Sequence, residues 1–359
     1  MLHDILEAYG LPPQDCLTEK LDSGLINRTW KVTAGQEEYV LQRVNNQVFK
    51  SPQDISDNIQ KIGRFLSTHS PGYLFISPVA TASGKYLVQD GAGDFYRLMP
   101  FVRGSRTIDT VRTREEAYEA ARQFGRFTSL LSGFGTQALH YTLPDFHNLT
   151  LRFEQFEAAY KLAEPERLTE ASGPIEAAFR HQGLVSTYQS VKTNSDIPLR
   201  VIHHDTKISN VLFDENGKGL CVIDLDTVMP GYFISDLGDM MRTYLSPVSE
   251  EERDLSKIII REDYFEAVIE GYFSEMAKEL TSAEKDLCLY AGEFMIYMQA
   301  IRFLTDFLNG DTYYATTYPK QNLVRAQNQF TLLQRYLDAE ERLDRIVHNF
   351  IDKEPARNS

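Results

Sequence analysis

The chain has 359 residues, of which 42% are hydrophobic and 25% are charged, and its formal net charge is −14. This length suggests two domains or two lobes, and the composition excludes a mostly disordered chain. The negative charge argues against a nucleic-acid partner, which would need a basic surface, but it does not exclude an anionic small ligand inside a cleft.

Three cysteines, Cys16, Cys221 and Cys288, stand far apart and lack the spacing of metal ligands. Such an odd and sparse set argues against a disulfide framework and is typical of a reducing compartment. Residues 1–7 lack the basic start and apolar core of a signal peptide, and no stretch approaches the roughly 18 apolar residues of a membrane helix. We therefore expect a cytoplasmic protein without membrane or nucleic-acid partners, and we favour a monomer.

The N-terminal part predicts a small antiparallel sheet that carries one helix. Residues 29–33 and 38–44 are rich in β-branched and aromatic side chains and flank a turn that contains glycine, which indicates a hairpin. A helix is expected over residues 52–68, because Pro52 follows the potential cap Ser51 and isoleucines recur on one face. Further short strands are expected around Val79, at 85–88 and at 94–100.

After Gly104 the pattern changes to long amphipathic helices. Thr113 with Glu116, and Thr281 with Glu284, have the spacing of capping boxes at two helix starts. The expected helices cover residues 113–131, 150–162, 170–190, 234 onwards, 281–308 and 319–351, while residues 199–226 predict short strands and turns.

These elements together predict an α+β protein with two lobes. The first lobe, residues 1–100, would be a small antiparallel β-sheet, and the second, residues 101–359, would be larger and mainly helical with a strand-and-turn insert. A short connection is expected near residues 100–104.

The most informative segment is a strand, a polar loop and a second strand over residues 199–214. After a hairpin turn the return strand ends at Asp224, so one hairpin delivers Asp205, Asn210 and Asp224 to the same end. Phosphoryl transfer depends mainly on positioning and on neutralising charge. Asp205 could accept the hydroxyl proton, and Lys207 could stabilise the transferring group. The oxygens of Asn210 and Asp224 are hard ligands of the kind that Mg²⁺ prefers.

The residues from His203 to Asn210 have the spacing H-x-D-x-K-x-x-N of the protein-kinase catalytic loop. Asp224 stands where the kinase Asp-Phe-Gly motif has its metal-binding aspartate. Asp and Asn also form ordinary turns, but the complete set between strands favours catalysis over that alternative. We therefore predict a kinase that uses ATP and Mg²⁺, with Asp205 and Lys207 as catalytic residues and with Asn210 and Asp224 as metal ligands.

The chain resembles the aminoglycoside phosphotransferase and choline kinase superfamily, and within it the N-acetylhexosamine 1-kinases. The closest stretches are residues 198–214, 222–231 and 302–325, and a weaker similarity runs from about residue 17 to 340. The resemblance implies a bilobal protein-kinase-like fold that phosphorylates the anomeric 1-hydroxyl of N-acetylglucosamine or N-acetylgalactosamine. A kinase of another small alcohol, of the choline, ethanolamine, homoserine or aminoglycoside type, remains an alternative, as does a catalytically inactive binding protein.

The same resemblance implies roles for residues outside the catalytic loop. Asp226 would support Mg²⁺ or the sugar, and Arg302 and Tyr313 would contact the sugar. Arginine offers forked donors to hydroxyl or acetamido oxygens, and tyrosine offers a ring face with a hydroxyl. The alternatives are that Arg302 pairs with Asp306 on the same helix and that Tyr313 is an ordinary packed aromatic residue.

The β-rich lobe should cover the nucleotide. Gly24 and Asn27 lie in a segment between two strands where a phosphate-covering loop belongs, and the residues around Asn27 resemble the loop of the family. Met99 and Val102 occupy the expected hinge, where the Met99 carbonyl and the Val102 amide could bind adenine because Pro100 has no N–H.

The chain departs from the kinase pattern on its third strand. Gln42, followed by Arg43, stands where kinases have a phosphate-binding lysine. Successive strand residues face opposite sides, so only one of the two can point into the cleft. Either Gln42 binds phosphate as a neutral donor, or the strand shifts to present Arg43.

Asp236 and Asp239 open the helix that is expected from Ile234. They could form a scaffold that binds the catalytic loop by hydrogen bonds. The simpler alternative is that Asp236 caps the helix. Neither interpretation makes these residues catalytic.

Overall fold

The structure is a computed structural model that describes residues 2–21 and 26–351. The chain divides into two compact units. Unit 1 comprises Met1–Arg106, Leu130–Pro144 and Leu212–Pro230, and unit 2 comprises Thr107–Ser129, Asp145–Val211 and Gly231–Ser359. Each unit therefore draws on three separate stretches of sequence. The lobe boundary predicted at residue 100 lies a few residues before the end of the first stretch of unit 1.

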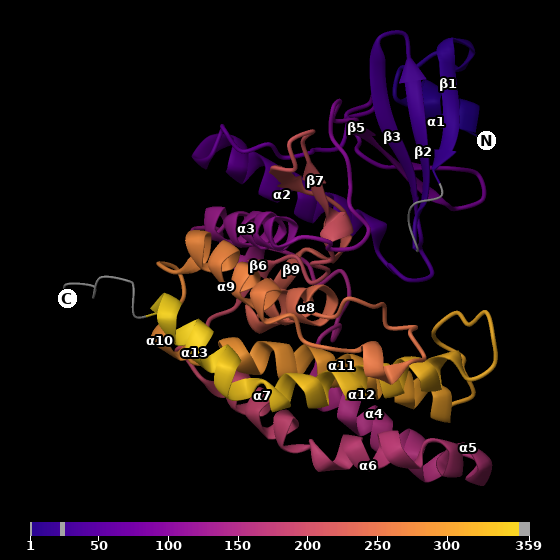
Figure 1. The fold of residues 1–359 in the computed structure, drawn as a ribbon. Coiled ribbons are helices and arrows are strands. Elements are labelled where there is room, and N and C mark those ends of the chain that lie inside the picture. Colours follow the sequence, from indigo (N-terminus) through magenta and orange to yellow (C-terminus); the bar gives the residue numbers. More distant parts are fainter. Residues whose placement is uncertain (1, 22–25, 352–359) are drawn as a thin grey trace. The chain divides into compact units, whose positions relative to one another are not determined.

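Unit 1 is built on a five-stranded antiparallel sheet with the strand order β1-β2-β3-β5-β4, four strands of which are labelled side by side in Figure 1. Alternate side chains, such as Val32, Leu41 and Leu98, form one core cluster with Ile5 and Leu6. The strands and the helix that covers this face are α1 (Leu2–Ala8), β1 (Cys16–Leu21), β2 (Arg28–Ala34), β3 (Glu37–Val44), β4 (Val88–Gln89) and β5 (Phe95–Pro100).

Helix α2 (Pro52–His69) confirms the predicted helix in this part of the chain, although Ser51 makes no hydrogen bond as a side-chain cap. Its buried polar residue, Asn58, joins three stretches of unit 1. The Asn58 side chain donates to the carbonyl of His140 at 2.9 Å and to that of Val228 at 3.2 Å, and its oxygen accepts from the His140 amide at 2.9 Å. These bonds fix the segment around Val228 relative to α2.

The predicted hairpin after the catalytic loop is present as β7 (Val211–Phe213) and β8 (Gly219–Val222). The Asp214 amide donates to the Lys218 carbonyl at 2.9 Å, and Gly217 takes the positive φ of 80° that this turn needs. A one-turn 3-10 helix, η4 (Leu225–Thr227), follows directly.

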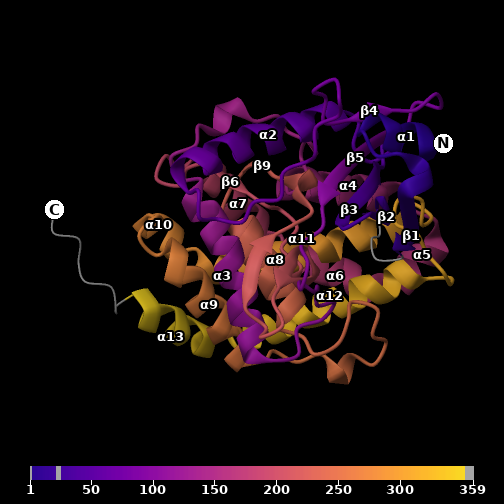
Figure 2. The ribbon, with the colours of Figure 1, turned by 90° about the horizontal axis from the view of Figure 1, so that it is seen from above.

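Unit 2 is mainly helical. Helix α11 packs against α4, α8 and α12, and Figure 2 shows α11 and α12 running side by side. The elements of this part of the chain are α3 (Arg114–Leu130), α4 (Leu149–Leu162), α5 (Pro165–Glu170), α6 (Ser172–Arg180), α7 (Gly183–Thr193), β6 (Arg200–Ile202), η3 (Ile208–Asn210), α8 (Ile234–Tyr244), α9 (Glu262–Met276), α10 (Ser282–Lys285), α11 (Cys288–Leu308), α12 (Gln321–Asp338) and α13 (Glu340–Ile351). The short strand β9 (Met229–Gly231) begins in the last stretch of unit 1 and ends at the first residue of the next stretch of unit 2.

Both predicted capping boxes form. The Glu116 amide donates to Thr113 Oγ1 at 3.2 Å and the Thr113 amide donates back to Glu116 at 3.3 Å. Thr281 and Glu284 make the same reciprocal pair, but the helix that they cap is the short α10, which is separate from α11. Within the residues that the structure describes, no helix is long and apolar enough to cross a membrane.

Several predictions of regular structure are wrong in detail. The strand expected at residues 85–88 is the shorter β4, which begins only at Val88. Residues around Val79 form no strand, because Pro78 removes a donor and only the Val79 amide bonds to the sheet, at 2.7 Å to the Leu98 carbonyl. The helix predicted over 170–190 is divided among three helices, two of which begin beside Gly173 or at Gly183. The single helix predicted up to Ile351 turns at Ala339, which is buried, so that α13 packs against α9.

Candidate active site

The loop between β6 and η3 in unit 2 gathers three of the side chains that the sequence predicts to be catalytic or metal-binding. Lys207 Nζ lies 3.1 Å from Asp205 Oδ1. The Asn210 side-chain nitrogen donates to the Asp205 carbonyl at 2.9 Å, which directs the Asn210 amide oxygen away from that carbonyl. The Asp205 side chain is 23% exposed, so a small solute can reach it.

Burial alone would raise the pKa of Asp205. The positive charge of Lys207, the neighbouring His203 and a hydrogen bond from Asn210 outweigh this effect and hold the pKa below its ordinary value. Asp205 is therefore ionised at neutral pH and can accept a proton from a hydroxyl group.

Two aspartates of helix α8 hold the backbone of this loop. The amides of His203 and His204 donate to the two oxygens of Asp236, at 2.8 and 2.7 Å, and the Thr206 amide donates to Asp239 at 2.9 Å. Burial raises the pKa of Asp236 to about 7. The structure thus confirms the interpretation of these aspartates as a scaffold for the loop.

His203 is buried and belongs to the support of the loop. Its ring lies edge-on to Phe124 and Phe127, with centroids 5.1 and 6.4 Å away, and its Nδ1 accepts from the Asp205 amide at 3.4 Å. These contacts give this histidine a structural role in the loop.

His204 adopts a left-handed backbone conformation, with φ at 67°. Its side chain lies directly over Gly231, where a Cβ atom would approach His204 Nε2 to 2.5 Å and Ile202 Cδ1 to 2.6 Å. A larger residue at this position would therefore displace the side chains of His204 and Ile202.

A second group of unit 2 side chains surrounds Arg302 on α11. The Arg302 guanidinium lies over the rings of Phe146 and Tyr314, 5.5 and 5.6 Å from their centroids, and donates to Gln299 Oε1 at 3.1 Å. Gln299 in turn donates to the Tyr314 hydroxyl at 3.2 Å. The group therefore combines aromatic faces with polar donors.

The charged groups that act on His147, beside Phe146, are cationic. His147 is half-buried and stacks on Phe146 with centroids 4.3 Å apart. Its pKa lies well below the ordinary value because of burial first and then because of His204 and of arginines that include Arg302 and Arg152. This part of unit 2 thus disfavours a further positive charge.

Asp306 does not make the ion pair with Arg302 that the sequence left open. Its Oδ1 accepts from the amides of Thr312 and Tyr313, at 3.0 and 2.7 Å, and its Oδ2 accepts from the Tyr314 amide at 2.9 Å. The buried aspartate therefore fixes the loop after α11. The Tyr313 ring on this loop is 72% exposed rather than packed in a core.

In unit 1, Asp224 ends the hairpin with a left-handed backbone (φ 57°, ψ 59°) and an exposed side chain. Aspartate tolerates this conformation better than most residues do. An exposed carboxylate at this turn is chemically suited to binding a hard cation.

Asp226, two residues further on, is buried in a network of unit 1. Asn27 Nδ2 donates to Asp226 Oδ2 at 2.8 Å, and Arg97 Nη1 forms a short ion pair with Asp226 Oδ1. The Thr142 hydroxyl donates to the Asp226 carbonyl at 2.7 Å. Both carboxylate oxygens of Asp226 are therefore engaged by side chains of its own unit.

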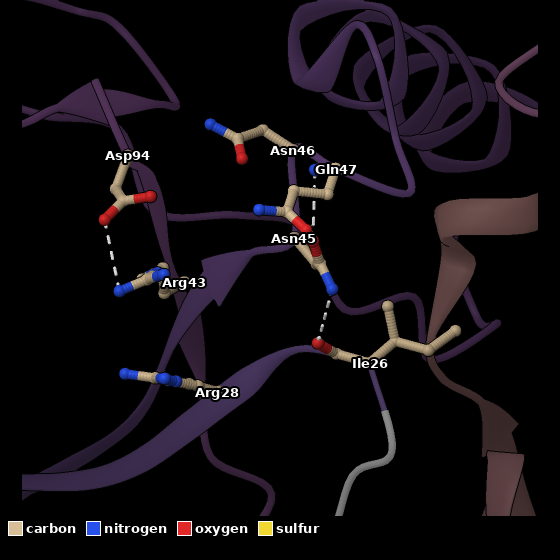
Figure 3. A pocket seen from close by; sticks show the side chains of 7 residues that line it. All are labelled: Ile26, Arg28, Arg43, Asn45, Asn46, Gln47 and Asp94. Carbon is tan, nitrogen blue, oxygen red and sulfur yellow. Dashed lines mark hydrogen bonds and ion pairs between the residues drawn. The ribbon is translucent and has the colours of Figure 1, made fainter. Parts of the chain in front are cut away.

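Gln42 and Arg43 face opposite sides of the sheet, as strand geometry requires. Gln42 accepts from Arg97 Nε at 2.9 Å, whereas Arg43 pairs with Asp94 at 3.1 Å in a polar pocket on the other side (Figure 3). The pocket is lined by Ile26, Arg28, Arg43, Asn45, Asn46, Gln47 and Asp94. The register of β3 is regular, so the strand has not shifted to bring Arg43 to the face that carries Gln42.

The other predicted nucleotide contacts lie around the same sheet. Gly24 lies outside the described residues. Asn27 Oδ1 accepts from the Asn45 amide at 3.0 Å, which links the β1–β2 segment to the end of β3. Met99 pairs with Val40 in the sheet register, and Val102 follows β5, where its carbonyl accepts from the Ser105 hydroxyl at 2.6 Å.

A small antiparallel sheet with a long helix in the same unit, a mainly helical second unit and an Asp-x-Lys-x-x-Asn loop are features of the kinase-like fold. The family model described as "Phosphotransferase enzyme family" matches residues 18–267. The chain therefore belongs to this family of phosphotransferases.

Several solved structures share the fold at low sequence identity. A microcompartment-associated aminopropanol kinase has a TM-score of 0.62 at 18% identity, over 94% of this chain and 97% of its own. Amicoumacin kinase hAmiN, in complex with AMP-PNP, Ca²⁺ and Ami, has a TM-score of 0.60 at 17% identity, over 99% and 93%. A choline/ethanolamine kinase family protein from Mesorhizobium loti has a TM-score of 0.57 at 14% identity, over 97% and 98%.

Sequence reasoning missed Arg97, Gln299, Phe146 and His147. Arg97 lies within a strand that was predicted, but its meeting with Gln42 depends on the register between β3 and β5. The other three residues come from two separate stretches of unit 2, and no local motif marks them.

Proposed function

We propose that this protein transfers the γ-phosphate of ATP to the anomeric 1-hydroxyl of an N-acetylhexosamine. The observation that carries the phosphotransfer is the loop in which Asp205, Lys207 and Asn210 meet on a backbone held by α8. The presence of AMP-PNP and Ca²⁺ in the amicoumacin kinase structure supports the use of a nucleotide with a divalent cation.

Each residue of the loop has a chemical task in this proposal. Asp205 orients the acceptor hydroxyl and accepts its proton, and its lowered pKa keeps it ionised for this purpose. Lys207 stabilises negative charge on the transferring phosphoryl group. Asn210 and Asp224 would hold Mg²⁺, which neutralises the phosphates when it is bound. The oxygen donors that these two residues offer suit a hard cation.

The acceptor is proposed to bind among Arg302, Gln299, Phe146 and the loop that carries Tyr313. Stacked rings and amide or guanidinium donors suit the ring face and the hydroxyl and acetamido oxygens of a sugar. An ammonium group would have to enter beside arginines and histidines. This charge pattern favours an uncharged sugar over choline, ethanolamine or an aminoglycoside.

A panel of acceptors incubated with ATP and Mg²⁺ tests the assignment. ADP release and the phosphorylated position, read by NMR, should identify phosphorylation of N-acetylglucosamine or N-acetylgalactosamine at position 1. Choline, ethanolamine, homoserine and an aminoglycoside serve as the competing acceptors. Turnover of one of these alcohols while both acetamido sugars stay inert would reject the hexosamine substrate but retain the kinase.

Replacing Arg302 by Met should raise the KM for the sugar by about tenfold or more and leave the KM for ATP unchanged. The change removes charged donors while keeping a side chain of similar length, and hydrogen bonds to charged groups are worth about 1.5–3 kcal/mol. Steady-state kinetics with each substrate varied in turn measures the effect. Arg180→Met, on the exposed side of α6, is the matched control and should leave both constants unchanged. An equal rise in both KM values would contradict a role limited to the acceptor.

Replacing Asp224 by Asn should raise the Mg²⁺ concentration needed for half-maximal activity by at least about tenfold, because a neutral ligand replaces a charged one. Titration of activity with Mg²⁺ at a fixed, saturating ATP concentration measures the shift. Asp15→Asn, in the 3-10 helix that precedes β1, is the control for a changed surface charge. A Mg²⁺ requirement equal to that of the wild type would remove Asp224 from the metal site.

A further inference from the structure

A buried arginine occupies the face of the β-sheet that carries Gln42. Leu41 and Leu98 are register partners on the face that forms the core with α1. The next pair in the register is Gln42 with Arg97, whose side chains therefore project from the opposite face. Position 42 of β3 carries no cation, but its register partner on β5, Arg97, does.

The contacts of Arg97 connect this face of the sheet to the turn that follows β8. Arg97 is 3% exposed; its Nε donates to Gln42 Oε1 at 2.9 Å and its Nη1 pairs with Asp226, which is 2% exposed. Asn27, at the start of β2, donates to the second oxygen of Asp226. Four side chains therefore form one polar network, the Arg97–Asp226 network (Asn27, Gln42, Arg97 and Asp226). Its two charged members are buried, and its two amide members are half-buried.

We propose that the Arg97–Asp226 network takes the place of the missing strand lysine. The network holds Asp224, which directly precedes η4, and Asn27, which directly precedes β2, in the arrangement that binds Mg–ATP. Arg97 is a positioning residue in this proposal, which rests on the proposed kinase function. It acts through Asp226, which lies two residues after Asp224 in the same turn. Gln42 accepts one of the donors of Arg97 and so fixes the plane of the guanidinium group.

The cost of burying the charges of Arg97 and Asp226 supports a functional role for this ion pair. A charge pair that is withdrawn from water loses hydration, and apolar residues of the same volume commonly stabilise a fold equally well. Arg97 and Asp226 nevertheless occupy a site where they meet two amide side chains, one on each partner. The directional bonds of the network fix geometry, which is what a turn bearing a metal ligand requires.

The experiment compares nucleotide binding without turnover in variants that remove the network. Arg97→Gln combined with Asp226→Asn removes both charges and leaves no buried charge unpaired. We expect this double variant to bind Mg–ATP at least tenfold more weakly than the wild type in isothermal titration calorimetry. Its affinity for adenosine, which has neither phosphate nor metal, should stay unchanged. Equal affinity of the double variant and the wild type for Mg–ATP overturns the proposal.

The matched control is the buried pair of Arg200 with Glu284 in unit 2, in which two guanidinium nitrogens bond to the carboxylate at 2.8 and 2.7 Å. Arg200→Gln combined with Glu284→Gln should reduce thermal stability and leave Mg–ATP affinity unchanged. If this control weakens Mg–ATP binding as much as the first double variant, the effect is one of general stability and the proposal is rejected.

A conservative variant covers the case in which the double variant does not fold. Arg97→Lys keeps the charge but cannot donate to Gln42 and Asp226 from two nitrogens of one plane. We expect it to weaken Mg–ATP binding severalfold and to leave adenosine binding unchanged, and wild-type binding of both would reject the proposal. Failure of the proposed function is a separate result, because it would appear as absence of phosphoryl transfer by the wild type.

Discussion

Replacing Asp205 by Asn should lower kcat by about 10²- to 10⁴-fold, the range that a positioned general base contributes. Asn preserves the size of the side chain and can still bond to its surroundings, but it cannot accept the proton of the acceptor hydroxyl. ADP release in the presence of the preferred acceptor measures the loss. The KM values should change little, because the substitution acts on the chemical step.

Two measurements separate this effect from damage to the fold. The variant should keep its affinity for the nucleotide, and its thermal unfolding should stay close to that of the wild type, because the loop backbone is held by Asp236 and Asp239. Turnover by Asp205→Asn equal to that of the wild type would remove Asp205 from the reaction. It would leave the chain as a phosphotransferase-family protein with another base or with no activity.

Replacing Gly238 by Ala should lower the free energy of unfolding by about 3 kcal/mol, at the upper end of the usual cost of overpacking. Gly238 lies where α8 packs against α11, and a Cβ atom there would approach the Ala291 carbonyl oxygen to 2.1 Å and Met295 Cβ to 2.9 Å. A backbone oxygen within a helix cannot move aside on its own, so the two helices must separate. Urea denaturation monitored by circular dichroism measures the change.

The matched control for this substitution is Gly173→Ala in α6, where no atom lies within 4 Å of the added Cβ. It should change stability by no more than about 0.5 kcal/mol, because the advantage of alanine over glycine is small in the first turn and is opposed by the following Pro174. Gly238→Ala should also reduce activity, since α8 carries the aspartates that hold the catalytic loop. Equal stability of the two alanine variants would contradict the tight helix contact.

The catalytic loop and its hairpin could be predicted from the sequence because their signals are local. The spacing from His203 to Asn210, the turn at Gly217 and the capping box of Thr113 each lie within a few residues, and each appears in the structure at the predicted place. The scaffold role of Asp236 could also be predicted, because a carboxylate at the start of a helix readily accepts hydrogen bonds from backbone amides.

The rest of the candidate site depends on contacts between distant residues. Arg97 and Asp226 are separated by 129 positions, and their pairing follows from strand register and from the place of η4 in unit 1. Residue patterns predict that β5 exists but not which residue faces Gln42. Tertiary packing likewise ends α12 before the buried Ala339, where the sequence has neither glycine nor proline.

The left-handed backbones of His204 and Asp224 have a consequence for engineering. Each position forces an L-amino acid into a conformation that costs roughly 1–2 kcal/mol and that glycine adopts freely. A laboratory selection for heat resistance alone would therefore favour glycine at the exposed Asp224, whereas at the buried His204 the loss of ring packing would outweigh the gain. The more durable enzymes that it yielded would have lost a carboxylate from the proposed metal site, so screening for thermostability must be coupled to turnover.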